Sequence, residues 1–257
     1  MGDSIEAFTP REFSEIYKDI YANLTEGQAP AKQRCTYILG GQPGAGKTSF
    51  FRENPETEDY IAINGDDYRV YHPNYEEIVQ KDIYDMPQMT QRFCNAVVEH
   101  LISDLGDEGY NMVIEGTLRT PQTPITTCGQ LKKKGYHTYL VVMACDAETA
   151  WESTLERAEL MVKRGGYPRL VSIEIYNDIV KNIVKNLEQI CAAACFDGVS
   201  VINREGVTLY PDSAGLSPAE VLEKELNYEK WERRFPEYAR EFEQIQDALY
   251  CKNLKNS

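Results

Sequence analysis

The chain has 257 residues and a formal net charge of −14 at pH 7, a length that suits one sizeable α/β domain with added helices. This acidic balance argues against a surface that neutralises nucleic-acid phosphates, so we expect no nucleic-acid partner. The seven cysteines are scattered without a C-x-x-C pair, and neither a leader segment nor a long apolar run is visible, which argues against a disulfide framework, a zinc site and membrane insertion. We therefore expect a cytoplasmic protein.

The first predicted elements are a helix at Thr9–Leu24 and a strand at Cys35–Gly40. Thr9-Pro10-Arg11-Glu12 is typical of a helix start, because it combines a capping threonine, a proline in the first turn and a glutamate three residues after the cap. Directly after the strand comes a complete G-x-x-x-x-G-K-[ST] loop. Its glycines let backbone N–H groups curl around phosphates, while Lys47 reaches the β- and γ-phosphates and Thr48 can hold Mg²⁺. The predicted nucleoside triphosphate site comprises Gly41, Gln42, Pro43, Gly44, Ala45, Gly46, Lys47, Thr48 and Ser49.

The remaining pattern alternates strands with helices, which predicts an α/β fold: a P-loop NTPase-type parallel sheet flanked by helices, with additional C-terminal helices. We expect a single domain over residues 1–257, with a core from about 34 to 212 and a helical extension from about 213 to 257. Aromatic residues at near-helical spacing in that extension favour core packing over a docking face. The further strands are expected at Tyr60–Ile63, Tyr110–Ile114, His137–Ala144 and Val199–Asn203, with a hairpin partner at Gly206–Tyr210. The further helices are expected at Lys47–Asn54, Met89–Leu105 (ending at Gly106), Ile125–Lys134, Ala147–Lys163 and Val171–Ala194, and from Ser217 to the C-terminus with an interruption near Pro236.

Polar residues follow three of these strands, and the carboxyl ends of parallel strands meet at one edge of a sheet. Phosphoryl transfer needs a carboxylate that orients or deprotonates the attacking hydroxyl, and cations around the migrating group. Either Asp66 or Asp67 can be that carboxylate, and Glu115 can bind a substrate hydroxyl or a magnesium-bound water. His72 can contact substrate or pack within its loop. The candidate cations are Arg157, Arg164 and Arg169, which flank a Gly-Gly break suited to a mobile segment.

At this point the sequence resembles the zeta-toxin family of bacterial kinases. The resemblance covers approximately residues 10 to 212, and its glutamate-glycine-threonine-leucine-arginine and His-Pro-Asn runs are more specific than the phosphate-binding loop. The matching runs are Gly40–Thr48, Ile63–Arg69, His72–Tyr75, Ile114–Thr120, Leu131–Tyr136 and Ser153–Arg157.

The resemblance implies an ATP-dependent kinase that phosphorylates the 3′-hydroxyl of the amino sugar in UDP-N-acetylglucosamine and that a small helical antitoxin inhibits. It makes Asp66 the catalytic base, Lys47 the phosphate ligand, and Thr48 with Asp66 the Mg²⁺ ligands. It also implies that Arg157 and Arg169 are the cations on the γ-phosphate. The substrate-binding residues it implies are Arg69, His72, Glu99, Glu115, Thr117, Arg119 and Thr127.

The chain departs from the family pattern in three places. Asn64 stands where the family usually has aspartate, the stretch from Lys163 to Gly166 differs from the usual sequence, and Tyr176 replaces an expected histidine region. The second departure leaves Arg164 and Arg169 as alternatives for the second cation, and spacing favours Arg169.

Three other functions stay open at this level. A kinase of another small molecule, such as an antibiotic or a nucleoside, would use the same core with a different acceptor. A GTP-driven switch is disfavoured because no Asn-Lys-x-Asp motif is visible, and a polynucleotide 5′-kinase is disfavoured by the acidic charge.

Overall fold

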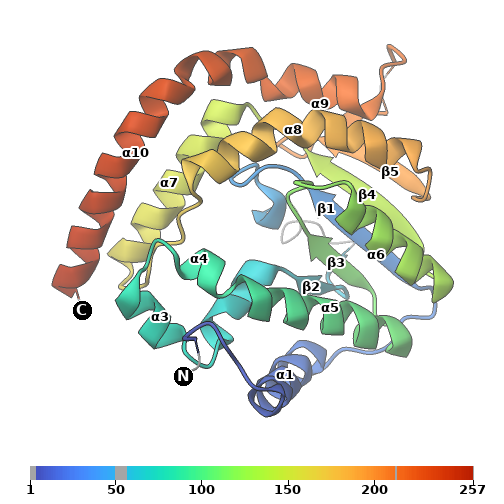
Figure 1. The fold of residues 1–257 in the computed structure, drawn as a ribbon. Coiled ribbons are helices and arrows are strands. Elements are labelled where there is room, and N and C mark those ends of the chain that lie inside the picture. The colour runs from blue at the N-terminus through green and yellow to red at the C-terminus, as the bar shows by residue number, and fades with distance from the viewer. Residues whose placement is uncertain (1–3, 50–56, 212, 257) are drawn as a thin grey trace.

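A six-stranded sheet forms the centre of the computed structural model, which describes residues 4–49, 57–211 and 213–256 (Figure 1). The strand order is β2-β3-β1-β4-β5-β6; the first five strands are parallel, and β6 pairs antiparallel with β5. This arrangement confirms the expected α/β class with a mainly parallel sheet. The strands are β1 (Cys35–Gly40), β2 (Ile61–Ile63), β3 (Met112–Glu115), β4 (His137–Met143), β5 (Gly198–Ile202) and β6 (Thr208–Tyr210).

Helices cover the sheet and extend beyond it. The predicted capping box at Thr9 and Glu12 is present, and a second one starts a C-terminal helix at Ser217. The helices are α1 (Pro10–Thr25), η2 (a 3-10 helix, Gly65–Tyr71), α3 (Tyr75–Lys81), α4 (Met86–Met89), α5 (Gln91–Glu108), α6 (Gln122–Lys133), α7 (Ala147–Lys163), α8 (Ile173–Ala192), α9 (Pro218–Leu226) and α10 (Tyr228–Asn256).

Two expectations about the helices were wrong, and three short helices were not predicted. Helix α5 runs through Gly106 and ends at Gly109, whose left-handed φ of 89° terminates it. The C-terminal helices break at Asn227, also left-handed, while α10 continues through Pro236. The short helices η2, α3 and α4 were not predicted, since each is too short to show a hydrophobic period. The helix expected at Lys47–Asn54 lies partly outside the described residues.

Buried apolar residues form a separate cluster on each face of the sheet. Successive residues of β3 point to opposite faces, so Val113 joins one cluster and Met112 and Ile114 join the other. The first cluster lies between the sheet and helices α7 to α10, and the second lies beneath α1 and α5. Both faces are covered, and in open α/β sheets of this kind ligands bind at the carboxyl ends of the strands.

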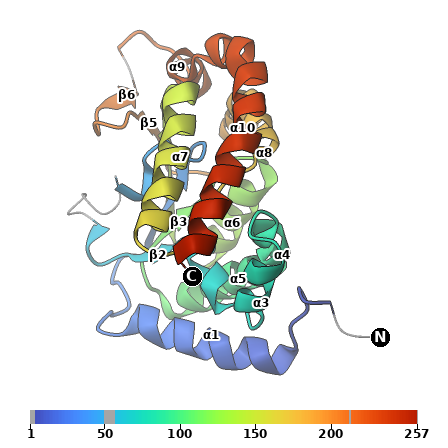
Figure 2. The ribbon, with the colours of Figure 1, turned by 90° about the vertical axis from the view of Figure 1, so that its left-hand side faces the viewer.

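The C-terminal helices pack into the first of these clusters, as expected for their aromatic residues. Trp231 is fully buried in α10, and its ring lies 4.9 Å from that of Tyr176 in α8 and 6.1 Å from that of Trp151 in α7. Figure 2 shows α10 running alongside α7. No helix of the described chain has the length and apolar character that a membrane span needs.

Candidate active site

The phosphate-binding loop follows β1, with β3 on one side of that strand and β4 on the other. Gly41, Gly44 and Gly46 have φ values of 144°, 79° and 100°, a region that side chains with a Cβ rarely adopt. Space also requires glycine at Gly44, because a Cβ there would come within 2.0 Å of the Ala150 carbonyl oxygen. The loop is anchored by the buried Gln42, whose amide donates to the Cys145 carbonyl at 2.7 Å. The loop conformation is therefore fixed by glycines and by one buried hydrogen bond.

Lys47 folds back onto the loop in this structure. Its Nζ donates to the Gly41 carbonyl at 2.8 Å and to the Gln42 carbonyl at 3.0 Å. Burial lowers the pKa of Lys47 to about 8, although the carboxylate of Glu115 acts in the opposite direction. Both partners of this ammonium group within the described residues are neutral carbonyls, so a charged phosphate oxygen would bind it more strongly.

Glu115 at the end of β3 lies beside the loop. Its Oε2 accepts from the Thr48 hydroxyl at 3.2 Å and from the Asn64 amide at 3.5 Å. Burial raises the pKa of Glu115, and nearby Asp67 and Asp66 raise it further, against the charge of Lys47 and the Thr48 hydrogen bond. The end of β3 thus meets the phosphate-binding loop directly.

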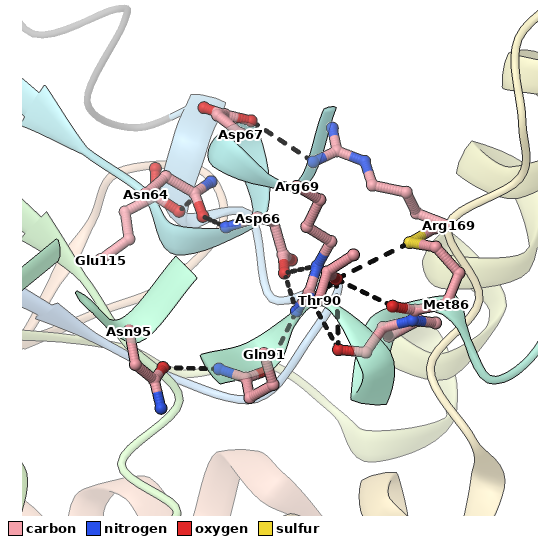
Figure 3. Close-up of polar contacts among 11 residues, drawn as sticks. Asn64, Asp66, Asp67, Arg69, Met86, Thr90, Gln91, Asn95, Glu115 and Arg169 are labelled. Atoms are coloured by element: carbon pink, nitrogen blue, oxygen red, sulfur yellow. Dashed lines mark hydrogen bonds and ion pairs between the residues drawn. The ribbon is translucent and has the colours of Figure 1, made fainter. Parts of the chain in front are cut away.

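Asp66 is held by one arginine, as Figure 3 shows. Arg69 Nε and Nη2 both donate to Asp66 Oδ1, at 2.9 and 2.7 Å. Burial alone would raise the pKa of Asp66, but the charge and hydrogen bonds of Arg69, with Arg169 and Arg157, leave it below its ordinary value. Asp66 is therefore ionised at neutral pH, and its Oδ2 has no hydrogen-bond partner in the described part of the chain.

Arg69 is buried and its five N–H donors are all used inside the protein. Besides Asp66, they reach the Pro87 carbonyl at 2.6 Å, the Thr90 hydroxyl at 2.8 Å and the Gln91 amide oxygen at 3.2 Å. No donor is left for a substrate. The geometry favours a positioning role for Arg69 over the substrate contact expected from the sequence.

The neighbouring Asp67 faces the segment between α7 and α8. Arg169 Nη1 lies 3.3 Å from Asp67 Oδ1 (Figure 3). Desolvation lowers the pKa of Arg157, and the positive charge of Arg169 lowers it further, which indicates that the two guanidinium groups lie near each other. The structure therefore brings Arg157 and Arg169 to the two aspartates.

The same segment docks on α3 through Tyr167. The Tyr167 hydroxyl donates to Glu76 Oε2 at 3.2 Å, and its ring lies 6.3 Å from that of Tyr75. Arg164 is exposed at the end of α7 and contributes to none of the interactions described for the aspartates. Of the two alternatives for the second cation, only Arg169 lies at the site.

Four of the residues expected to bind substrate make no contact with the phosphate-binding loop, Asp66 or Asp67 in the described part of the chain. His72 is buried, its ring 5.3 Å from that of Phe93, and its Nδ1 accepts from the Asn74 backbone at 3.1 Å. Burial lowers its pKa, against the nearby Glu6 carbonyl. This placement is that of a packing histidine. Arg119 pairs with Asp178 of α8 at 3.1 Å, while Glu99 on α5 is exposed and Thr127 on α6 is partly buried.

The oxygen groups near the loop suit a hard divalent cation. Thr48 and Glu115 are 3.2 Å apart through their side-chain oxygens, and Asp66 is close enough to raise the pKa of Glu115. Mg²⁺ typically uses one or two protein oxygens together with phosphate oxygens. Thr48 and Asp66 are therefore chemically suited to the role expected of them, and Glu115 joins them as a further oxygen donor.

Sequence reasoning missed several residues that build the site. Thr90 and Gln91 accept hydrogen bonds from Arg69. Arg204 follows β5; its Nη2 lies 3.0 Å from the Ser153 hydroxyl, and its side chain lies against Gly46. The position of Arg204 directly after a strand could have identified it as a site residue. Thr90 and Gln91 carry no such signal, because a polar pair at a helix start is usually a cap.

Comparison with known proteins gives consistent matches. Residues 19–214 match the family model described as Zeta toxin. The chain is 36% identical over 231 residues to Toxin zeta of Streptococcus pyogenes, covering 87% of this chain and 80% of that protein. It is 32% identical over 230 residues to Toxin PezT of Streptococcus pneumoniae, covering 88% and 91%. A solved structure from the PezAT chromosomal toxin-antitoxin system of Streptococcus pneumoniae is similar in fold, with a TM-score of 0.76 at 30% identity, covering 96% of this chain and 99% of that one.

Proposed function

Because this chain belongs to the zeta toxin family, we propose that it is an ATP-dependent kinase that phosphorylates the 3′-hydroxyl of the amino sugar in UDP-N-acetylglucosamine. The observation that carries the proposal is the arrangement at the strand ends. A glycine-rich phosphate loop lies beside a carboxylate, Asp66, that an arginine holds by one oxygen only. A phosphate donor and a hydroxyl acceptor are the two groups that this pair suits.

Asp66 orients the attacking hydroxyl. Arg69 occupies Oδ1, so Oδ2 is available to accept the hydrogen of the sugar alcohol. The lowered pKa keeps the carboxylate ionised but makes it a weak base. Because phosphoryl transfer passes through a loose transition state, alignment of the oxygen matters more than early proton removal.

Three cations neutralise the phosphoryl oxygens. Lys47 exchanges its two loop carbonyls for the β- and γ-phosphates of ATP. Arg169, which has a partly exposed partner in Asp67, exchanges that ion pair for the γ-phosphate, with Arg157 beside it. In both exchanges a partner within the protein is replaced by the more highly charged phosphate. The cations then stabilise the charge of the phosphoryl group in the transition state.

Thr48 and Glu115 would hold Mg²⁺, with the negative charge of Asp66 nearby. When bound, the ion would neutralise part of the negative charge of the ATP phosphates. The acceptor sugar would lie over Glu115 and Thr117, which follow β3. Arg119 would reach its phosphates by exchanging its ion pair with Asp178. Glu99 and Thr127, expected from the resemblance, have no contact with these residues in the described part of the chain.

We also infer that the chain acts as the toxin of a toxin-antitoxin pair, inhibited by a small helical protein. The similarity to a chain of the PezAT toxin-antitoxin system supports this. Helix α1 lies at the periphery of the molecule, beside α5, and is the element against which we expect such a protein to pack (Figure 2). Size-exclusion chromatography of the chain with a protein encoded next to it tests the pairing, and separate elution would contradict it.

Product identification tests the kinase. After incubation with ATP, Mg²⁺ and UDP-N-acetylglucosamine, mass spectrometry should show one added phosphoryl group on the sugar, and Lys47→Ala should abolish it. Acceptors of other classes, such as antibiotics and nucleosides, belong in the same assay. Transfer to one of them alone would support the alternative, a P-loop kinase of another small molecule.

A further inference from the structure

The loop that follows β3 carries Thr117 and Arg119 and has a strained backbone. Leu118 has a φ of 52°, a left-handed conformation that residues other than glycine rarely adopt. Its side chain is buried against Gly40 at the end of β1, where an added Cβ would come within 2.4 Å of Leu118 Cδ1. The loop after β3 therefore packs directly against the strand that leads into the phosphate loop.

A single buried side chain of α8 holds this conformation. Asn186 is 7% exposed, and its Nδ2 donates to the Leu118 carbonyl at 2.9 Å and to the Arg119 carbonyl at 2.8 Å. One amide nitrogen has two hydrogens, so both are used. The same helix also pairs with Arg119 through Asp178, at 3.1 Å.

These two bonds also determine where the loop's N–H groups point. In a trans peptide unit the C=O and the following N–H point in opposite directions, so the N–H groups of Arg119 and Thr120 point away from α8. Neither makes a hydrogen bond to any described residue. Two adjacent backbone N–H groups of this kind can donate hydrogen bonds to the oxygens of a bound anion.

Building on the proposed function, we infer that Asn186 is a positioning residue for the acceptor: it fixes the Leu118 backbone so that Thr117, Arg119 and the two N–H donors meet the nucleotide sugar in a single arrangement. The phosphate loop does not depend on Asn186, since its own glycines and Gln42 hold it. Loss of Asn186 should therefore affect the acceptor and leave ATP binding intact.

Two variants test this. Asn186→Ala removes both hydrogen bonds without weakening α8, because alanine is the better helix former. Asn186→Asp keeps the shape but sets a carboxylate against two carbonyl oxygens. We expect the KM for UDP-N-acetylglucosamine to rise about tenfold or more in Asn186→Ala, and further in Asn186→Asp, while the KM for ATP stays within about twofold. Gln189→Glu, an exposed amide on the same helix, is the matched control for the added charge and should leave both values unchanged.

Hydrogen–deuterium exchange of residues 114–121 provides a measurement that does not depend on activity. Exchange there should be faster in both variants than in the parent protein, with the phosphate loop unchanged. An equal rise in both KM values, or unchanged exchange and unchanged KM, would overturn the inference. If the parent protein fails to phosphorylate the sugar, the proposed function fails, whereas unchanged exchange at residues 114–121 in both variants would show that Asn186 does not hold the loop and would overturn the inference by itself.

Discussion

At the carboxyl edge of the sheet, arginines and carboxylates meet across segments far apart in the chain, whereas the far side of α7 and α8 is joined to α10 by aromatic rings. The ion pair of Asp67 with Arg169 has side chains 57% and 32% exposed. Trp151 and Trp231 are at most 1% exposed, and Trp231 donates to Asn177 at 2.9 Å. One region has charges with accessible partners, and the other has almost no exposed surface.

This difference separates function from stability. A partly exposed ion pair adds about 0 to 1 kcal/mol, so it can be exchanged for a ligand at little cost to the fold. A buried aromatic cluster contributes several times more and cannot be exchanged. Substitutions at the carboxyl edge should consequently change kcat, and substitutions in the aromatic region should change the free energy of unfolding.

The largest expected effect is on the reaction itself. Asp66→Asn should reduce kcat by about 10²- to 10⁴-fold, because it removes the carboxylate that orients the hydroxyl. Asp67→Asn should keep a substantial part of the activity, since it removes only the partner of Arg169. Steady-state kinetics with ATP, Mg²⁺ and UDP-N-acetylglucosamine measure both, and equal losses would contradict the assignment of the base.

The largest expected effect on stability comes from the aromatic region. Trp231→Ala should lower the free energy of unfolding by about 3 to 5 kcal/mol, through the cavity it leaves. Its kcat at a temperature where the variant is folded should be close to that of the parent. Urea unfolding gives the first value, with Trp231→Phe as a milder variant. If Trp231→Ala lost its activity while its free energy of unfolding stayed unchanged, the two regions would not differ in the way proposed here.

A smaller effect tests which arginine serves the γ-phosphate. Arg169→Gln should lower kcat by about 100-fold, since a transition-state cation is lost. Arg164→Gln, at an exposed position at the end of α7, should leave kcat within about twofold. The same kinetic assay compares the two, and a reversed order would show that spacing and geometry had selected the wrong residue.

The smallest effect concerns a charge inside the stable region. Glu148 is 4% exposed, and its carboxylate lies 2.5 Å from Lys230 Nζ and 3.4 Å from Arg234 Nη1, joining α7 to α10. Glu148→Gln should destabilise the protein less than Trp231→Ala, because both cations stay partly in water. Urea unfolding at low and high salt checks this: the loss should shrink as salt screens the pair. A loss that salt does not alter would mean that packing, and not charge, dominates here.

Much of the fold could be predicted because its signals are local. The strand before Gly41, the cap at Thr9 and the helix at Ala147–Lys163 are each specified by adjacent residues, and each has the expected form. The errors occurred where local rules compete: Pro236 was expected to break a helix that packing maintains, and Gly106 was expected to end a helix that Gly109 ends.

The candidate site was predicted less completely. Strand ends located Asp66, Glu115 and the phosphate loop at one edge, and the structure brings them together. His72 and Arg69 were expected to contact substrate from their position in a motif, but burial and internal hydrogen bonds occupy them.

The sequence by itself therefore determined the α/β sheet, the phosphate-binding loop and the set of charged residues at its edge, since strand, loop and cap patterns are written in contiguous residues. Only the tertiary structure decided how those charges pair. Asp67 and Arg169 are 102 residues apart, and Leu118 and Asn186 are 68 apart. The packing of the sheet and helices determines which of these residues meet, and the spacing of residues along the chain does not predict it.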